Sequence, residues 1–519
     1  MSSVQLRLVG LAVLLGAVGG ALGTLLLGQD GGFDLKNYHW YNPHALLNGR
    51  LEQDILVAQL QSYFNPALDL PFYLAVEQFG PKAGSMLLGA VHGLNFSLVV
   101  LLASKLLPSG GPRGGFPRPP VLWFLCGVVG CWGPIFVADL GGSRGDTTTS
   151  LFVLAALLCL LRRAGPAFVL SGLAMGIGWG LKLTVGVYVA GGLAALVLVG
   201  LDGPRGRFQS ALRWCFGVFA GLLASFGPWS VHLVRSYENP VFPFANQFFR
   251  SPYALPVDFS ERRFHPEGVV ESILFPLKFA SGGEVAWTFA YRDLRFGLLY
   301  VLVGVAVALW LWRRRTGSLE VAASEDRRPL AFVLCFTVLS YVAWQWGFCV
   351  YRYLAALELL APTVIVVLVA RLGTSRVWTP LMQLSLLLLI VVFVRVPEVE
   401  RLPWEEDLFQ VEVPPVRGAG VVVLAGDDAT SYLVPSFPAE LRFVRIQSNL
   451  SFPDDETRLN ELMRAVVTRE EGPLYFIKGP HPIDHESLRT FGLRIVEGSC
   501  RAIVSRVDSG LALCDLMRD

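Results

Sequence analysis

The acidic residue best placed for catalysis is Asp34. It follows the first long apolar stretch of the chain by a few residues, directly after Gly31-Gly32-Phe33. A carboxylate at the membrane surface can accept the proton of an attacking hydroxyl group. The sequence therefore predicts a catalytic base at Asp34, with an ordinary surface aspartate as the alternative. Tyr38 and His39 are predicted to contact the substrate, although an aromatic belt at the membrane surface is another interpretation of this segment.

Charged residues that interrupt apolar sequence indicate an anion site. Lys182 closes one apolar stretch within GLKLT, and Arg352 begins another within YRYLAALELLAP. Charges in membrane helices are costly and are usually functional or paired. The two cations are predicted to bind an anionic substrate at the membrane boundary, and snorkelling to the surface is the alternative. Glu358 lies about 9 Å further along the same helix as Arg352. It is a substrate-binding candidate that needs a partner on another helix.

The segment ADLGGSRGDTTTS (138–150) supplies a second group of charges. Asp146 precedes three threonines and is a good N-cap for the helix expected there. Arg144, beside that helix N-terminus, would strengthen phosphate binding and is a substrate-binding candidate. Asp139 and Asp146, together with Asp34, could hold a divalent cation such as Mg or Mn if their separate loops converge.

The long polar segment 236–293 contains further candidates. Its stretch NPVFPFANQFFRSP (239–252) is dense in Pro and Phe, which suggests a folded-back segment along the membrane surface. Arg250 and Arg292 are candidates for phosphate or glycan contacts, and solvated loop charges are the alternative.

The composition indicates a membrane protein, because 53% of the residues are hydrophobic and only 16% are charged. Soluble domains carry about 25% charged residues. A net charge of +2 without a basic stripe or zinc-finger spacing gives no support for nucleic acid as a partner. Since a membrane span needs about 20 apolar residues, we predict eleven transmembrane helices. They are 4–28, 83–107, 120–139, 147–163, 166–184, 185–201, 212–235, 294–312, 329–346, 353–370 and 377–395.

Lys and Arg collect in alternate loops between these helices. By the positive-inside rule the N-terminus is cytoplasmic, and eleven spans place the C-terminus outside. The polar segments 29–82 and 236–293 then face outward as well. The chemistry is therefore expected on the non-cytoplasmic face.

The tail has the composition of a small α/β domain, so the predicted organisation is a membrane module at 1–396 and a soluble domain at 397–519. Apolar runs at 421–425, 442–446, 474–478 and 500–504 predict strands, and 455–469 predicts a helix. The tail lacks a phosphate loop and is interpreted as a structural lid or an acceptor-docking module. Cys500 and Cys514 could form a disulfide in an oxidising compartment, but a hairpin turning at 508–510 would not place them directly opposite.

The chain resembles the GT-C superfamily of integral membrane glycosyltransferases, in particular the bacterial protein O-mannosyltransferase and aminoarabinose transferase group. The stretches that carry the likeness are FDLKNYHWYNPHALLNGR, YFNPALDLPFY, GDTTTS, LKLT, NPVFPFANQFFRSP and YRYLAALELLAP. The resemblance implies a multi-pass protein of the bacterial inner membrane with a periplasmic C-terminal domain. It implies a polyprenyl-phosphate-linked sugar donor and a lipid, glycan or protein acceptor. Asp34 matches the catalytic carboxylate of the family's first outer loop. The chain lacks a WWDYG-type signature, which argues against protein N-glycosylation.

The expected reaction is a direct displacement that inverts the anomeric carbon. The lipid phosphate is a good leaving group and needs cationic stabilisation more than a general acid. A polysaccharide ligase or polymerase and a transporter or flippase of lipid-linked glycans remain alternatives, as does a non-enzymatic scaffold. The absence of an evident internal repeat disfavours the transporters built from duplicated halves.

Overall fold

The computed structural model describes residues 3–107, 119–202, 206–316, 328–372, 375, 377–469, 471–483 and 485–519. The chain folds into two compact units. Unit 1 contains Met1–Leu26, Met86–Phe226 and Glu261–Val399, and unit 2 contains Leu27–Ser85, Gly227–Ser260 and Glu400–Asp519. Unit 2 thus combines the tail with two earlier segments, a grouping that the composition of the tail does not reveal.

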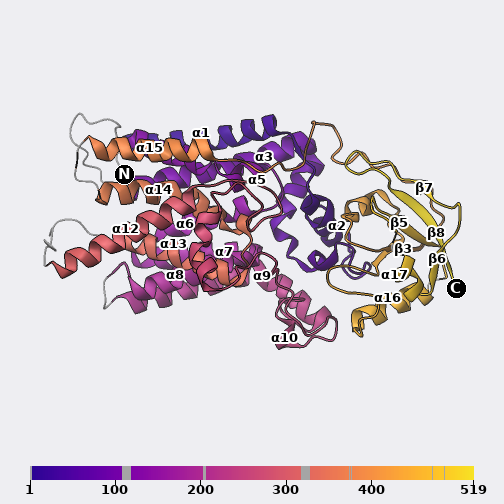
Figure 1. Ribbon diagram of the computed structural model, residues 1–519. Coiled ribbons are helices and arrows are strands. Elements are labelled where there is room, and N and C mark those ends of the chain that lie inside the picture. Colours follow the sequence, from indigo (N-terminus) through magenta and orange to yellow (C-terminus); the bar gives the residue numbers. More distant parts are fainter. Residues whose placement is uncertain are drawn as a thin grey trace. The chain divides into compact units, whose positions relative to one another are not determined.

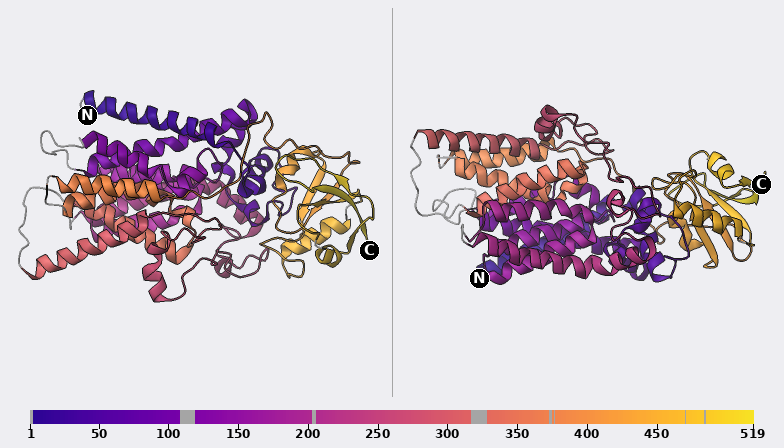
Figure 2. Two further views of the ribbon diagram at one scale, coloured as in Figure 1. Left: turned by 45° about the horizontal axis from the view of Figure 1, so that its top comes forward. Right: turned by 90° about the horizontal axis from the view of Figure 1, so that it is seen from below.

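Apolar helices make up most of unit 1, where they run side by side as a bundle (Figures 1 and 2). In the described part of the chain, six helices are long and apolar enough to cross a membrane, and five more are shorter. The long ones are α1 (Ser3–Leu27), α3 (Leu70–Leu106), α9 (Arg207–Tyr237), α12 (Arg295–Arg315), α13 (Arg328–Gly347) and α14 (Ala355–Leu372). The shorter ones are α4 (Pro119–Gly130), α6 (Asp146–Leu160), α7 (Gly165–Leu181), α8 (Gly186–Leu198) and α15 (Trp378–Phe393). These eleven helices match the eleven predicted spans one for one, and the helical membrane-protein class is confirmed.

Two predicted spans differ from the structure in ways that affect the candidate site. The span predicted at 120–139 is broken into α4 and the short α5 (Pro134–Asp139). Pro134 begins α5, a position where its missing N–H costs nothing. The span predicted at 166–184 ends early, because Lys182 has extended backbone angles and a 3-10 turn, η4 (Leu183–Val185), follows it. Lys182 therefore lies at a break between two helices.

Glycines bring pairs of helices in unit 1 into close contact. A Cβ atom at Gly93 would lie 1.9 Å from the carbonyl oxygen of Gly16, and one at Gly20 would lie 2.0 Å from that of Gly89. Small residues four apart let two membrane helices approach backbone to backbone, so α1 and the second half of α3 pack tightly. The same spacing joins α7 to α9 at Gly172, Gly176, Gly217 and Gly221.

Helix α14 is the core of unit 1. Every residue from Ala355 to Val369 is buried. A helix that is apolar on all sides must be surrounded by other elements, and α14 packs against α4, α6, α12, α13 and α15. It is preceded by a 3-10 turn, η5 (Tyr351–Leu354), which carries Arg352.

Unit 2 contains a mixed sheet in the order β4-β3-β5-β8-β6, with β7 paired to β8. The strands are β3 (Gly420–Leu424), β4 (Leu441–Arg445), β5 (Leu474–Lys478), β6 (Leu493–Ile495), β7 (Arg501–Ala502) and β8 (Ala512–Arg518). Strands β4, β3 and β5 are parallel, and β8 is antiparallel to β5 and β6. Helices α16 (Arg458–Arg469) and α17 (His485–Thr490) lie beside this sheet (Figure 1). The predicted strands at 421–425, 442–446 and 474–478 are confirmed, whereas 500–504 forms only the two residues of β7.

The first polar segment of the chain extends this sheet. The Ile55 amide donates to Phe443 O over 2.9 Å, and the Arg445 amide donates to Ile55 O over 3.0 Å, so that Ile55 pairs in parallel with β4. Next to this pairing, Asp54 accepts hydrogen bonds from Arg50 Nε at 2.8 Å and from the Phe443 amide at 2.9 Å. Burial raises the pKa of Asp54, and the Arg50 guanidinium opposes that shift. A short ladder of β1 (Gln29–Asp30) with β2 (Arg401–Leu402) also joins the first segment to the tail.

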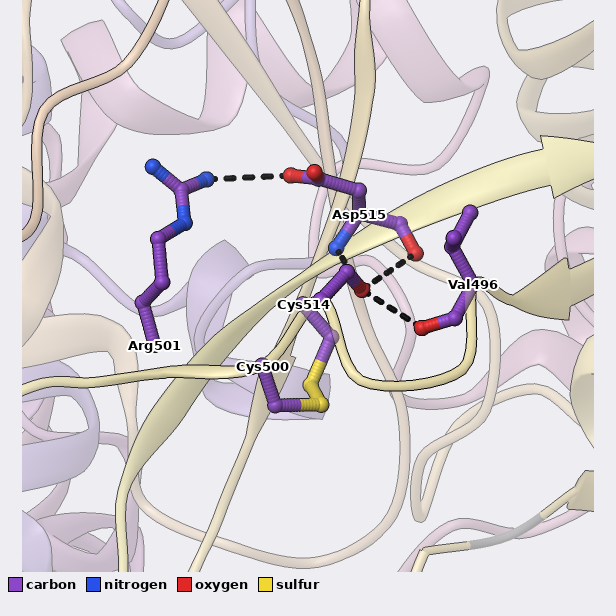
Figure 3. Close-up of a disulfide and its surroundings, with 6 residues drawn as sticks. Val496, Cys500, Arg501, Cys514 and Asp515 are labelled. Carbon is purple, nitrogen blue, oxygen red and sulfur yellow. Dashed lines mark hydrogen bonds and ion pairs between the residues drawn. A yellow bond between two sulfur atoms is a disulfide. The ribbon is translucent and has the colours of Figure 1, made fainter.

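The structure contains the disulfide that the sequence left open, between Cys500 and Cys514 (Figure 3). The pairing of Arg501 with Leu513 and of Ala502 with Ala512 places the two cysteines directly opposite. The expectation that they would be offset was wrong, because the chain between the strands forms a wide loop rather than a hairpin turning at 508–510. Beside the disulfide, Arg501 Nη2 lies 3.0 Å from Asp515 Oδ1.

Replacing Cys514 by serine is expected to destabilise unit 2. A cross-link that closes a loop of about 15 residues restricts the unfolded chain by about 3 kcal/mol. The expected result is a lower unfolding temperature of unit 2, and treatment of the wild-type protein with dithiothreitol should reproduce it. Limited proteolysis followed by mass spectrometry measures this change. The Cys215→Ser variant, which changes a cysteine of unit 1 that lies outside any disulfide, is the control and should unfold like the wild type.

Candidate functional site

Three segments of unit 1 that are distant in sequence meet at Asp146, the first residue of α6. Its Oδ1 atom lies 2.6 Å from Lys182 Nζ at the break between α7 and α8. Its Oδ2 atom lies 3.9 Å from Arg352 Nε in η5. The side chain of Asp146 is 3% exposed, whereas those of Lys182 and Arg352 are 14% and 19% exposed. The carboxylate is thus buried while both cations remain partly accessible.

Tyr353 completes this group, which we call the Lys182 cluster (Asp146, Lys182, Arg352 and Tyr353). Lys182 Nζ lies 5.5 Å and Arg352 Cζ 5.4 Å from the centre of the Tyr353 ring. The ring face attracts both cations, so they are held near each other despite their like charge. The backbone of Tyr353 is fixed in turn, because Tyr188 Oη donates to its carbonyl oxygen over 2.6 Å.

The Lys182 cluster has a formal charge of +1, from two cations and one carboxylate. Including the nearby Arg144 and Asp139 leaves this excess unchanged. Arg144 contributes its carbonyl oxygen, which accepts from Lys182 Nζ at 2.7 Å, while its guanidinium donates to Ala138 O over 3.2 Å. Two partly exposed cations with a net positive charge can bind an anion such as a phosphate group.

The predicted metal ligands Asp139 and Asp146 have other partners in the structure. Asp139 Oδ2 accepts from the Thr147 amide at 2.9 Å, in the first turn of α6, and Asp146 pairs with Lys182. The connecting loop is held by His92, whose Nδ1 accepts from the Gly141 amide at 3.2 Å. Within the described residues no three His, Cys, Asp or Glu side chains are grouped so that they could hold a metal ion. Two adjacent side-chain cations also repel a divalent cation at Asp146.

Glu358 belongs to a separate, fully buried group in unit 1, the Arg295 network (Asp293, Arg295, Tyr351 and Glu358). Arg295 Nη1 lies 2.9 Å from Asp293 Oδ2 and 3.9 Å from Glu358 Oε2, and all three side chains are 0% exposed. Tyr351 Oη donates to Asp293 Oδ2 over 2.7 Å. The partner on another helix that Glu358 was expected to need is therefore Arg295.

The contacts of Glu358 are those of a structural residue. Its two carboxylate oxygens accept from the amides of Ile135 and Phe136, each at 3.0 Å, at the start of α5. Arg295 Nη2 donates to the carbonyl oxygen of Trp132 over 2.6 Å, in the turn between α4 and α5. The network thus closes the break between these helices. Substrate binding by Glu358 stays a prediction.

Sequence reasoning missed Arg295 and Asp293, although a charged pair at the start of a predicted span was an available signal. The neighbouring Arg292 was predicted to contact the substrate. Its amide donates to Arg395 O over 3.1 Å, and its carbonyl oxygen accepts from the Arg395 amide at 3.0 Å. Arg292 therefore anchors the start of α12 to the end of α15, and its role in binding also stays a prediction.

Asp34, Tyr38 and His39 lie in unit 2. Asp34 immediately precedes a π-helical turn, η1 (Leu35–His39), and is partly exposed. Tyr38 and His39 are buried, at 5% and 2% exposure. His39 Nδ1 lies 2.6 Å from Asp69 Oδ1, and the Tyr38 ring packs edge-on against Phe64. In this structure both therefore have the contacts of core residues, and their contact with substrate stays a prediction.

Two solved proteins are similar to this structure. ArnT from Cupriavidus metallidurans, bound to undecaprenyl phosphate, matches with a TM-score of 0.44 and 16% sequence identity over 74% of this chain. The match spans 64% of that protein, less than two thirds of its length. The apo oligosaccharyltransferase of Archaeoglobus fulgidus matches with a TM-score of 0.46 and 12% sequence identity. This match covers 91% of the present chain and 69% of the archaeal protein. No protein-family model and no curated protein matches the chain.

Proposed function

We propose that this chain is a membrane glycosyltransferase that takes a sugar from a polyprenyl-phosphate-linked donor and transfers it to an extracytoplasmic lipid, glycan or protein acceptor. The observation that carries the proposal is the Lys182 cluster, in which two accessible cations are held next to each other by Asp146 and Tyr353. A membrane protein that handles a lipid phosphate needs such a positive site.

The Lys182 cluster suits the leaving group of the reaction. When the bond between the anomeric carbon and the phosphate oxygen breaks, negative charge grows on the phosphate. Lys182 and Arg352 would stabilise that charge more strongly in the partly buried site than in water. Asp146 keeps the two cations in position while the site is empty, and it is exchanged for phosphate when the donor binds.

Asp34 is proposed as the base that removes the proton of the acceptor hydroxyl. Among the other aspartates of segment 29–82, Asp54 and Asp69 are buried and paired with Arg50 and His39. Asp30 is also buried, and its Oδ1 accepts from the Gly32 amide at 2.9 Å. Asp34 is partly exposed immediately before η1, and a base must be accessible to the acceptor hydroxyl from which it removes the proton. Attack of the acceptor oxygen opposite the departing phosphate inverts the anomeric carbon.

The Asp34→Asn variant is expected to bind the donor normally but to transfer sugar about 10²- to 10⁴-fold more slowly, because general base catalysis contributes a factor of that size. Transfer from a panel of undecaprenyl-phosphate sugars to membrane glycolipids, followed by mass spectrometry, measures the rate. Glu52→Gln, an exposed change in the same segment, is the control. Transfer that is unchanged in Asp34→Asn would reject the base while leaving the proposed enzyme class standing. Transfer from none of the donors by the wild type would reject the class.

The proposed location is a bacterial inner membrane, with the N-terminus in the cytoplasm and unit 2 outside. The Cys500–Cys514 disulfide supports this orientation, because disulfides persist in oxidising compartments and are rare in the cytosol. Alkylation of both cysteines in freshly isolated, unreduced membranes would contradict it.

A further inference from the structure

Unit 2 contains a cavity of about 710 Å³ that no step of the proposed reaction uses. One wall is the segment from Gln247 to Pro256, and the other runs from Glu456 into the first turn of α16, as far as Glu461. Its volume lies within the range of small-molecule sites, about 300–1,000 Å³.

Both walls are fixed by buried asparagines. Asn246 is 0% exposed, and the two hydrogens of its Nδ2 are shared among the carbonyl oxygens of Ser251, Ala254 and Leu255 at 2.9–3.1 Å. On the other wall, Asn460 Nδ2 donates to Phe452 O over 2.6 Å and to Asp455 O over 2.8 Å. A hydrogen bond of 2.9 Å from the Arg458 amide to Pro252 O links the two walls. The cavity is thus preformed, which limits the entropy that a ligand must lose on binding.

The polar groups that line the cavity suit an uncharged ligand rich in hydroxyl groups. Arg250 and Arg458 contribute two positive charges, and Glu456 and Glu461 contribute two negative charges. The lining is therefore neutral overall, unlike the Lys182 cluster, and it offers no net attraction to a phosphate. Carboxylates accept hydrogen bonds from hydroxyls, and guanidinium groups donate to them.

The same wall also offers apolar surface. Pro252, Ala254 and Leu255 supply apolar surface for the carbon face of a ring.

We propose that this cavity binds a neutral saccharide, and that the saccharide is part of the acceptor. That the saccharide is part of the acceptor rests on the proposed function, whereas saccharide binding itself is a property of the cavity alone. A peptide suits the cavity less well. The lining segments are a loop and a helix, so there is no strand edge for an added β-strand, and no aromatic groove for a proline-rich segment.

The test is a screen of the purified full-length protein on a glycan array, followed by titration of the best neutral oligosaccharide. The protein is held in polymer nanodiscs, because maltoside detergents carry sugar headgroups that would compete. The variants are Glu461→Gln and Arg250→Gly. Arg250 has a φ of 53°, a conformation that glycine adopts without strain, so the second variant removes the guanidinium and should still fold. Each variant is expected to bind the oligosaccharide about tenfold more weakly.

Glu440→Gln is the matched control, because Glu440 is an exposed residue of unit 2 outside the cavity lining. This variant should bind the oligosaccharide with the affinity of the wild type. The proposal is overturned if no neutral glycan binds, if binding is equal in all variants, or if only peptides or inorganic phosphate compete for the cavity. Binding of undecaprenyl phosphate is measured on the same samples. If the wild type binds the saccharide but does not bind undecaprenyl phosphate, the result counts against the proposed function and not against the saccharide site in the cavity.

Discussion

Replacing Lys182 by methionine or Arg352 by glutamine is expected to weaken binding of undecaprenyl phosphate and to slow sugar transfer by about 10²- to 10³-fold. This is the usual effect of removing one group that stabilises developing negative charge. Each variant leaves the formal charge of the Lys182 cluster at zero, so the attraction for phosphate is lost along with a hydrogen-bond donor. Thermophoresis with labelled lipid measures the affinity, and the donor panel measures the rate.

Whether Asp146→Asn strengthens or weakens the binding of undecaprenyl phosphate distinguishes an anion site from a metal site. Because Asp146 competes with phosphate for both cations, Asp146→Asn is expected to bind undecaprenyl phosphate more tightly. If Asp146 held a divalent cation instead, the same variant would lose donor binding, and so would the wild type in a chelator. Arg395→Gln removes a cation of unit 1 whose side chain is 56% exposed, and it should leave the affinity unchanged. Unaltered affinity in both Lys182→Met and Arg352→Gln would refute the phosphate site.

Two members of the Lys182 cluster, Lys182 and Arg352, could be predicted because a charge in apolar sequence stands out against a lipid-facing background. Asp146 stands out only as a helix start, and Tyr353 was not predicted. That Lys182 and Arg352 both pair with the Asp146 carboxylate could not be predicted, since this depends on how α6, α7 and η5 pack. For the same reason Asp146 was interpreted as a cap and metal ligand rather than as a counterion.

Hydropathy predicted the helices of unit 1 well, because lipid requires long apolar runs. It could not show that Glu358 reaches the break before α5, although Pro134 was a visible signal for that break. In unit 2, the apolar runs of β3, β4 and β5 were readable. Strand β6 is only three residues long, and β8 mixes polar with apolar residues. The pairing of Ile55 with β4 uses backbone atoms alone, so no pattern of side chains in the sequence predicts it.

Glu358→Ala is expected to destabilise unit 1 by about 2–6 kcal/mol, because two buried amides lose their acceptor at about 1–3 kcal/mol each. The change leaves the amides of Ile135 and Phe136 unsatisfied, while Arg295 keeps Asp293 as its counterion. The break between α4 and α5 then loses the contacts that close it. The unfolding temperature of the purified protein should fall sharply, and expression should fall with it.

The double variant Arg295→Met with Glu358→Gln tests whether the two residues act as a pair. Arg295→Met alone leaves the buried carboxylates of Asp293 and Glu358 without a cation, whereas the double variant leaves only that of Asp293. Its loss of stability should therefore be smaller than the sum of the two single losses. Glu398→Ala, at a side chain that is 94% exposed, is the control and should change stability by no more than about 0.5 kcal/mol. Donor affinity at a temperature where each variant is folded decides the role of Glu358. We expect it to be unchanged, because the Arg295 network is closed to solvent. Loss of affinity in folded Glu358→Gln would instead restore Glu358 as a substrate-binding residue.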